Sequence, residues 1–226
     1  MTAHARTRAG AFYAGILSLL FAALAHSADK LPEVTPDGLH LVKQDEFSAL
    51  YVRPGVSFAP YTKVAILECF VAFKSGWVQS MNADDPLSLT PQTVKDIKTR
   101  LAAEFMKVFK QQLSADGFAV VDDAAKDVLV LRPAIINLEI QAPDPMGQAD
   151  EVTISQSTGQ MTLYLELYDS VSSELLARVI DASAAGGSGG SFGWQTSVGN
   201  LMAADQILKQ WSDRLEKYLR SAQATH

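Results

Sequence analysis

The sequence predicts an α+β fold in which a mixed, mainly antiparallel sheet of about five strands carries two long helices. Residues 91–115 and 201–219 repeat apolar residues at helical spacing. Between them lie short runs rich in Val, Ile and Leu, as expected for strands. The predicted order is one strand, a helix, four strands and a final helix. It fits neither a doubly wound alternation nor a barrel.

The first strand is expected at residues 63–73, which are apolar on both faces and therefore typical of a central strand covered on both sides. Cys69 lies within it and is the only cysteine of the chain, so no internal disulfide can form. We expect a small buried core residue; the alternative is a reactive or intermolecular thiol.

The first helix is expected at residues 91–115, after a polar loop through Asp84, Asp85 and Pro86. Thr90 is suited to cap its N-terminus, Pro91 fits the first helical position, and Gly117 follows its end.

Several short strands follow this helix. Residues 118–121 and 128–131 read as strands, joined by one helical turn at residues 122–126. Arg132 and Pro133 then interrupt the pattern, where we expect a bulge or an edge. Beyond them one strand face is expected to carry Ala134, Ile136, Leu138 and Ile140.

The last strands are predicted to form a hairpin. Residues 161–168 alternate apolar and polar side chains, residues 169–174 form a turn, and residues 175–181 return as the partner strand. The Gly/Ser-rich loop at 185–193 is expected to be a flexible connector. In the final helix one stripe is expected to contain Leu201, Ala204, Leu208, Trp211, Leu215 and Leu219.

Residues 1–28 have the pattern of a secretory signal peptide. Arg6 and Arg8 precede an apolar run, and small residues place the cleavage site between Ala25 and Ala28. The alternative is an uncut N-terminal anchor. No twin-arginine motif and no lipid-acceptor cysteine follow, so we expect a periplasmic protein without a stable membrane anchor after cleavage. Residues 29–50 are predicted to be an extended N-terminal lead, and residues 51–222 a single α+β domain.

Charge and histidine content exclude several function classes. Cleavage would remove two of 19 basic residues and none of 25 acidic ones, so the net charge would change from −6 to −8, unfavourable for nucleic-acid binding. Outside the signal region only His40 and the terminal His226 remain. Histidine-dependent hydrolases and zinc sites are therefore not expected. We predict no enzyme, no cofactor and no metal site.

Acidic pairs leave one catalytic alternative open. Two carboxylates support glycoside cleavage, and oxygen-rich loops bind calcium. Because these acids lie in predicted loops or helix starts, we favour solvated side chains over a site. The residues concerned are Asp84, Asp85, Asp122, Asp123, Asp127, Asp144, Asp150 and Glu151.

Three aromatic residues are candidates for partner binding. Phe192 and Trp194 lie beside the Gly/Ser-rich loop, where they can dock a partner peptide or fold back onto the sheet. Trp77 is the third. The glycines do not form a phosphate-binding loop, since Phe192 occupies the third position of a G-x-G-x-x-G frame.

Four segments and one tryptophan resemble the bacterial envelope family named domain of unknown function 3313. They are residues 51–61, 127–144, 163–170 and 194–200, together with Trp211. The resemblance implies an envelope protein but brings no established activity and no catalytic residues. Many members look like lipoproteins, from which this chain departs because it lacks the lipid-acceptor cysteine.

The leading hypothesis is a non-enzymatic adaptor or binding module of the cell envelope whose sheet edge or Phe192–Trp194 loop binds another envelope protein. One alternative is a carrier of a small lipid or glycan, with a pocket between sheet and helices lined by Phe73, Trp77 and Tyr164. Another is a carboxylate-dependent cell-wall hydrolase. The partner and the oligomeric state cannot be read from the sequence.

Overall fold

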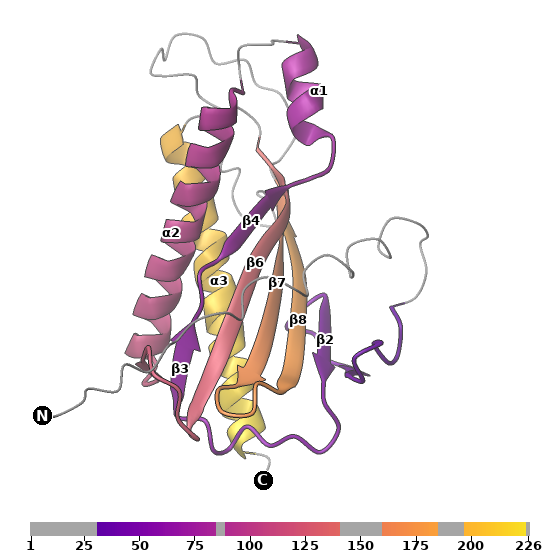
Figure 1. Ribbon diagram of the computed structural model, residues 1–226, viewed down its shortest axis with the longest axis vertical. Coiled ribbons are helices and arrows are strands. Elements are labelled where there is room, and N and C mark those ends of the chain that lie inside the picture. Colours follow the sequence, from indigo (N-terminus) through magenta and orange to yellow (C-terminus); the bar gives the residue numbers. More distant parts are fainter. Residues whose placement is uncertain (1–30, 85–88, 141–159, 185–196, 225–226) are drawn as a thin grey trace, which may run out of the picture. The chain divides into compact units, whose positions relative to one another are not determined.

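A mixed sheet of eight strands is the framework of the described part of the chain (Figure 1). The computed structural model describes residues 31–84, 89–140, 160–184 and 197–224. From Pro32 onward the chain forms one compact unit. The strands are β1 (His40–Val42), β2 (Ala49–Val52), β3 (Lys63–Ile66), β4 (Phe70–Phe73), β5 (Ala119–Val120), β6 (Val128–Glu139), β7 (Gln160–Asp169) and β8 (Leu175–Ala184).

The sheet is antiparallel in one half and parallel in the other. Its order is β1-β2-β8-β7-β6-β3-β5, and β4 pairs with β6 beyond the end of β3. Neighbouring strands in the part β1-β2-β8-β7-β6 are antiparallel. In contrast, β3 and β4 run parallel to β6, and β5 runs parallel to β3. The α+β class and the mixed, mainly antiparallel sheet are confirmed. The predicted strand number of about five is wrong, since the described residues form eight.

Residues 63–73 form two strands, where one was predicted. Both β3 and β4 pair with β6, and the interruption between them faces Pro133. The carbonyl oxygen of Leu131 accepts a hydrogen bond from the N–H of Leu67 at 2.9 Å. Every second residue of β6 around Leu131, including Pro133, therefore directs its backbone N–H and C=O positions toward β3 and β4. Because Pro133 has no N–H, the ladder breaks where β6 has no donor.

The bulge in β6 lies beyond its predicted position. Arg132 and Pro133 pair regularly with β7, and the register shifts instead between Ile136 and Glu139. Asn137 lies there with φ 52°, in the left-handed region that asparagine tolerates. The extra residue reverses which side chains face the core. The four residues expected on one face are therefore divided by the bulge: Leu138 and Ile140 belong to the main core, whereas Ala134 and Ile136 do not. Before the bulge the core residues of β6 are Leu129, Leu131 and Ile135.

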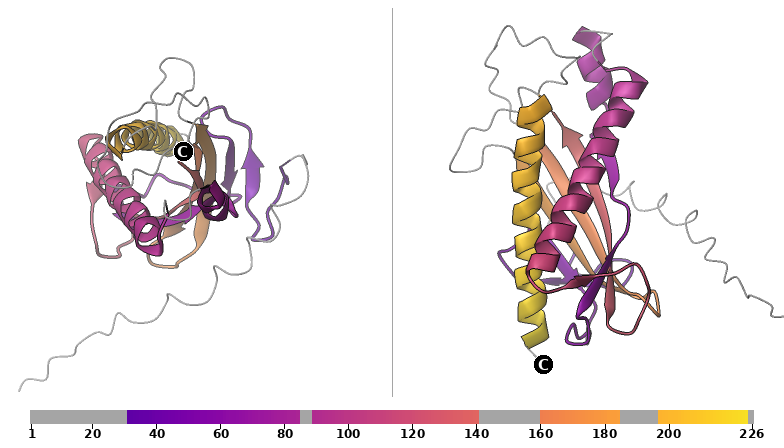
Figure 2. Two further views of the ribbon diagram at one scale, coloured as in Figure 1. Left: turned by 90° about the horizontal axis from the view of Figure 1, so that it is seen from above. Right: turned by 90° about the vertical axis from the view of Figure 1, so that its left-hand side faces the viewer.

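Two long helices cover the same face of the sheet (Figures 1 and 2). They are α2 (Pro91–Ala115) and α3 (Ser197–Ala224), and both were predicted. The Thr90 hydroxyl oxygen accepts a hydrogen bond from the Thr93 N–H at 3.1 Å and so caps α2 as expected. A short helix, α1 (Trp77–Asp84), was not predicted; residues 77–83 lie where only a polar loop was expected.

The main core lies between the two long helices and the sheet. The predicted stripe of α3 is buried at Ala204, Leu208, Trp211, Leu215 and Leu219. In β7, Leu163, Leu165 and Leu167 are fully buried in this core. Because strand side chains alternate, Tyr164, Glu166 and Tyr168 point to the opposite face. Among the described residues no helix covers that opposite face (Figure 2).

Part of the predicted N-terminal lead is folded onto this opposite face. The lead turns at residues 36–38, with Gly38 at φ 80°. After it, Leu39 is fully buried against Ala49 and Tyr51. The sheet therefore begins at β1, before the expected start near Tyr51, because the lead supplies enough apolar side chains to bury.

Two smaller predictions also have outcomes. Residues 122–126 form a loop and not a helical turn. The hairpin turn between β7 and β8 is confirmed. The signal segment and the Gly/Ser-rich loop lie outside the described residues. None of the helices in the described part of the chain is both long and apolar enough to cross a membrane.

Candidate functional site

The predicted candidate Trp77 lies at the first position of α1, directly after β4. The turn that joins them contains Gly76 at φ 76°. The Trp77 ring stacks on the Phe73 ring, with a centroid distance of 4.9 Å and an interplanar angle of 4°. From α2, the Lys98 ammonium lies 5.9 Å from the Phe73 centroid, within the range of a cation–π contact. Both aromatic residues are half-buried.

Phe70, at the start of β4, is 46 % exposed and is one of the few large apolar side chains at the surface of the described part of the chain. Its neighbour Val71 is buried in the main core. The strand β4 is therefore anchored by Val71 and exposes Phe70. Lys74 follows the strand and forms an ion pair with Glu139. We call Phe70, Phe73, Lys74, Trp77 and Lys98 the β4 corner.

The β4 corner includes an open edge of the sheet. In the described part of the chain, β4 pairs with β6 on one side and with no strand on the other. The outer edge of β1 is covered, because Val34 bridges to His40 and the Leu41 N–H donates to the Glu33 carbonyl oxygen at 2.8 Å. At the other side of the sheet, β5 is only two residues long. Open edges with apolar residues are sites where further strands add.

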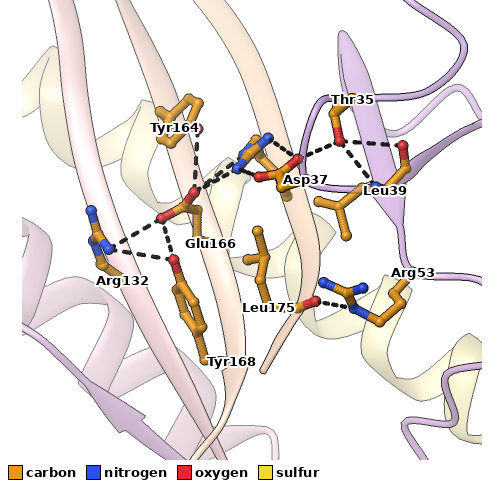
Figure 3. A network of polar contacts seen from close by, with 10 residues as sticks. Thr35, Asp37, Leu39, Arg53, Arg132, Tyr164, Glu166, Tyr168 and Leu175 are labelled. Carbon is orange, nitrogen blue, oxygen red and sulfur yellow. Dashed lines mark hydrogen bonds and ion pairs between the residues drawn. The ribbon is translucent and has the colours of Figure 1, made fainter. Parts of the chain in front are cut away.

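A cluster of polar side chains lies on the sheet face opposite the helices (Figure 3). Glu166 and Arg178 are each 5 % exposed. They pair directly across β7 and β8, with the Arg178 Nη2 2.9 Å from Glu166 Oε1. Arg178 also donates to both carboxylate oxygens of Asp37 from the folded lead. This cluster therefore fastens the lead to the sheet.

Two tyrosines complete the hydrogen bonding of Glu166. The Tyr168 hydroxyl donates to Oε2 at 2.8 Å, and the Tyr164 hydroxyl donates to Oε1 at 3.3 Å. Arg132 lies 3.6 Å from Oε2 and its guanidinium lies over the Tyr168 ring. Burial, together with the negative charge of Glu166, raises the pKa of Tyr168 to about 12. All four partners saturate the carboxylate, so this cluster is built as a support.

Asp37 shows how the support depends on charge. Its partial burial raises the pKa of the carboxyl group, but hydrogen bonds from Arg178 and Thr35 outweigh this and lower the pKa below its usual value. The charged form of Asp37 is therefore the one that the folded state favours.

The three residues that were expected to line a ligand pocket between sheet and helices do not lie together. Phe73 and Trp77 pack against the main core beside α2. Tyr164 lies on the opposite sheet face, where its ring contacts the Arg178 guanidinium at 5.4 Å. The three residues therefore do not line one pocket, because alternation along β7 turns Tyr164 away from the helices.

The other candidates have separate outcomes. Phe192 and Trp194 lie outside the described residues, so partner binding at all three aromatic residues stays a prediction. Cys69 is 4 % exposed, as expected for a core residue, and burial raises the pKa of its thiol to about 12.

The described acids do not gather into a metal site. Asp122 and Asp123 are exposed in a loop, and Asp127 pairs with Lys63 at 2.9 Å. Within the described ranges no group of three or more His, Cys, Asp or Glu side chains is placed to hold a metal ion. Asp85, Asp144, Asp150 and Glu151 lie outside those ranges, as does the side chain of Asp84.

Sequence reasoning missed the Glu166–Arg178 pair. Both residues are polar members of strands in a predicted hairpin, which was the available signal. A regular hairpin around residues 169–174 would pair Glu166 with Ala177. The observed register shift between Leu167 and Tyr168 moves Arg178 opposite Glu166.

Comparison with known proteins places residues 36–215 in the sequence pattern of a family described as "Protein of unknown function (DUF3313)". Among curated proteins, none matches the chain.

Three similar solved structures are the PelC dodecamer from Paraburkholderia phytofirmans, the hypothetical protein CT253 from Chlamydia trachomatis and a minor lipoprotein from Acinetobacter baumannii. Their sequence identities are 12 %, 12 % and 10 %, and their TM-scores are 0.36, 0.39 and 0.36. The matches cover 71 %, 70 % and 70 % of this chain and 96 %, 98 % and 94 % of those chains, respectively. At these values no property of the three proteins is assigned to this chain.

Proposed function

The chain belongs to the DUF3313 family of proteins of unknown function, and we propose that it is an exported, non-enzymatic binding module that binds another protein of the bacterial cell envelope through the β4 corner. The observation that carries this proposal is the open edge of β4. Phe70 is exposed at the start of this strand, and the stacked Phe73 and Trp77 rings lie at and just beyond its other end, on the side that α2 covers.

The chemistry of the β4 corner suits protein binding. Aromatic side chains that are already held in place supply apolar contact area at a small entropic cost. Phe73 and Trp77 hold each other by stacking, the Lys98 ammonium lies over the Phe73 ring, and Lys74 follows Phe73 in the chain. The contrast with the Glu166 cluster supports the choice, because there each carboxylate oxygen is already engaged within the chain.

Export rests on the signal pattern of residues 1–28. It predicts that the protein isolated from the periplasm begins between residues 26 and 29. Mass spectrometry of the intact protein from a periplasmic fraction measures this directly. A product that retains residues 1–28 would contradict cleavage and favour an N-terminal anchor.

Photocrosslinking in the cells that naturally make the protein tests the binding surface. Benzoylphenylalanine replaces Phe70 in one strain and Val171 in another. Val171 is 61 % exposed in the β7–β8 turn, at the other end of the sheet from α1 (Figure 1). We expect a defined protein crosslink from position 70 and none from position 171. Equal labelling from both positions, or none from either, would contradict the proposal.

A substitution separates binding from folding. Trp77→Ala removes the stacking partner of Phe73 and is expected to reduce the position-70 crosslink at least fivefold. Because Trp77 is only half-buried, the loss of stability should stay near 1 kcal/mol, about the size of an aromatic pair. Thermal unfolding checks this. An unchanged crosslink yield in a folded Trp77→Ala protein would exclude Trp77 from the surface.

A further inference from the structure

The β4 corner also indicates the form of the bound partner. We infer that the partner contributes an extended segment, with apolar residues and a carboxylate, that adds to the sheet as a strand along the open edge of β4. This inference rests on the proposed function and specifies the partner of the same surface.

Backbone geometry supports strand addition. In a parallel pair, alternate peptide groups of a strand face its neighbour, and the remaining groups face the other side. Since β4 pairs only with β6 among the described strands, the remaining groups of its four residues face the open edge. An extended segment of about four residues can satisfy them with a ladder of main-chain hydrogen bonds.

The sheet shows that this edge differs from the other edges. Residues 33–34 of the chain itself already occupy the outer edge of β1. The edge strand β5 offers two residues, too few for a stable ladder. The edge of β4 is longer, and it carries the exposed Phe70, against which an apolar side chain of an added strand can pack.

Charge gives the bound segment its chemistry and direction. Lys74 is paired with Glu139, whereas no acidic side chain in the described part of the chain forms an ion pair with Lys98. Lys98 lies at the Phe73 end of β4, and the exposed Glu68 precedes the other end. A carboxylate of the partner beside Lys98 complements this pattern, and the reverse orientation would place it near Glu68.

The experiment begins with the benzoylphenylalanine crosslink at position 70, whose attached peptide is sequenced by mass spectrometry. A synthetic peptide with that sequence is titrated into the purified full-length protein. Binding is measured by fluorescence anisotropy, and amide hydrogen exchange is followed at residues 70–73. We expect exchange at these residues to slow at least tenfold when the peptide is bound.

Two matched changes test the mode of binding. A peptide with proline at its central residue should bind at least tenfold more weakly, because proline removes a ladder donor. Lys98→Glu should weaken binding of the original peptide about fivefold. The control is Lys110→Glu, an exposed position on the same helix about 18 Å farther along, which should leave binding unchanged.

The outcomes separate the two proposals. A crosslinked partner whose peptide binds equally with proline, with unchanged exchange at residues 70–73, overturns strand addition and leaves the binding module in place. A crosslink that joins only two copies of this chain overturns a heterologous partner. The absence of any crosslink from position 70 would contradict both the proposed function and this inference.

Discussion

The indole N–H of Trp211 donates a hydrogen bond to Oδ2 of Asp181 at 2.9 Å and so joins the middle of α3 to β8. The same oxygen accepts from Arg214 at 2.7 Å. Oδ1 accepts from the backbone N–H of Ser48 at 2.9 Å and from its hydroxyl at 2.8 Å. Asp181 is 4 % exposed. One buried carboxylate therefore holds α3, β8 and the chain before β2 together.

Asp181→Ala is expected to lower the free energy of unfolding by about 3 kcal/mol. The substitution leaves the buried Trp211 N–H and the Arg214 guanidinium without their acceptor, and it also removes the tie to Ser48. Urea unfolding followed by circular dichroism measures the change.

The control for this prediction is Asp213→Ala, two residues after Trp211 on α3. Asp213 is exposed and accepts one hydrogen bond, from Gln112 at 3.1 Å. Its removal should change the free energy of unfolding by less than about 0.5 kcal/mol. Equal losses in the two variants would mean that Asp181 has no special role in joining the helix to the sheet.

The elements with a clear period could be predicted from the sequence. The apolar stripe of α3 and the capped start of α2 follow from local spacing and from Thr90 and Pro91. The role of Asp181 could not be predicted, because its main partners lie about 30 and 130 residues away in the sequence. A polar residue at the end of a predicted strand reads as solvated until tertiary structure brings Trp211 to it.

Irregularities in the strands also limited the prediction. The gap opposite Pro133 divides an apolar run into β3 and β4, and the bulge at Asn137 changes which face of β6 is buried. Local composition specifies neither where the gap between β3 and β4 falls nor where the bulge in β6 lies. The candidate site was limited in the same way. Trp77 could be chosen as an aromatic residue, but its place beside the open edge of β4 depends on the gap between β3 and β4.

Asp37→Asn is expected to destabilise the protein by about 1 kcal/mol at neutral pH, because it removes the negative charge that pairs with Arg178 at a partly exposed position. The folded-state pKa of Asp37 lies below its ordinary value of 3.8. The contribution of Asp37 is therefore complete above that value and is lost as the pH falls through the folded-state pKa. The difference between wild type and variant should shrink below about pH 4.

Denaturant unfolding at a series of pH values measures this difference, and the contributions of groups that both proteins retain largely cancel. Amide exchange at Leu39 gives a local readout, since the Asp37–Arg178 contact holds this part of the lead to the sheet. A difference that persists unchanged to low pH would show that Asp37 stabilises the lead by something other than its charge.

Asn137→Gly is expected to leave stability unchanged or to raise it by up to about 0.5 kcal/mol, because glycine adopts the φ of 52° without strain. Asn137→Val places a β-branched side chain in the left-handed region and should cost about 1 to 2 kcal/mol. The side chain is exposed, so lost packing contributes little. Thermal unfolding compares the two, and equal effects would contradict a conformational role for Asn137.

Glu166 and Arg178 are expected to be strongly coupled. Each is 5 % exposed, so Glu166→Leu leaves a buried cation and Arg178→Leu leaves a buried anion, at a cost of about 3 to 5 kcal/mol for each single variant. The double variant leaves neither of these two charges, so its loss should fall short of the sum by more than about 1 kcal/mol. Denaturant unfolding of the four proteins gives this coupling energy. The exposed Asp205–Lys209 pair on α3, measured in the same way, should couple by only about 0.3 to 0.5 kcal/mol. Equal coupling in both pairs would mean that burial on the helix-free face does not strengthen the dependence of Glu166 and Arg178 on each other.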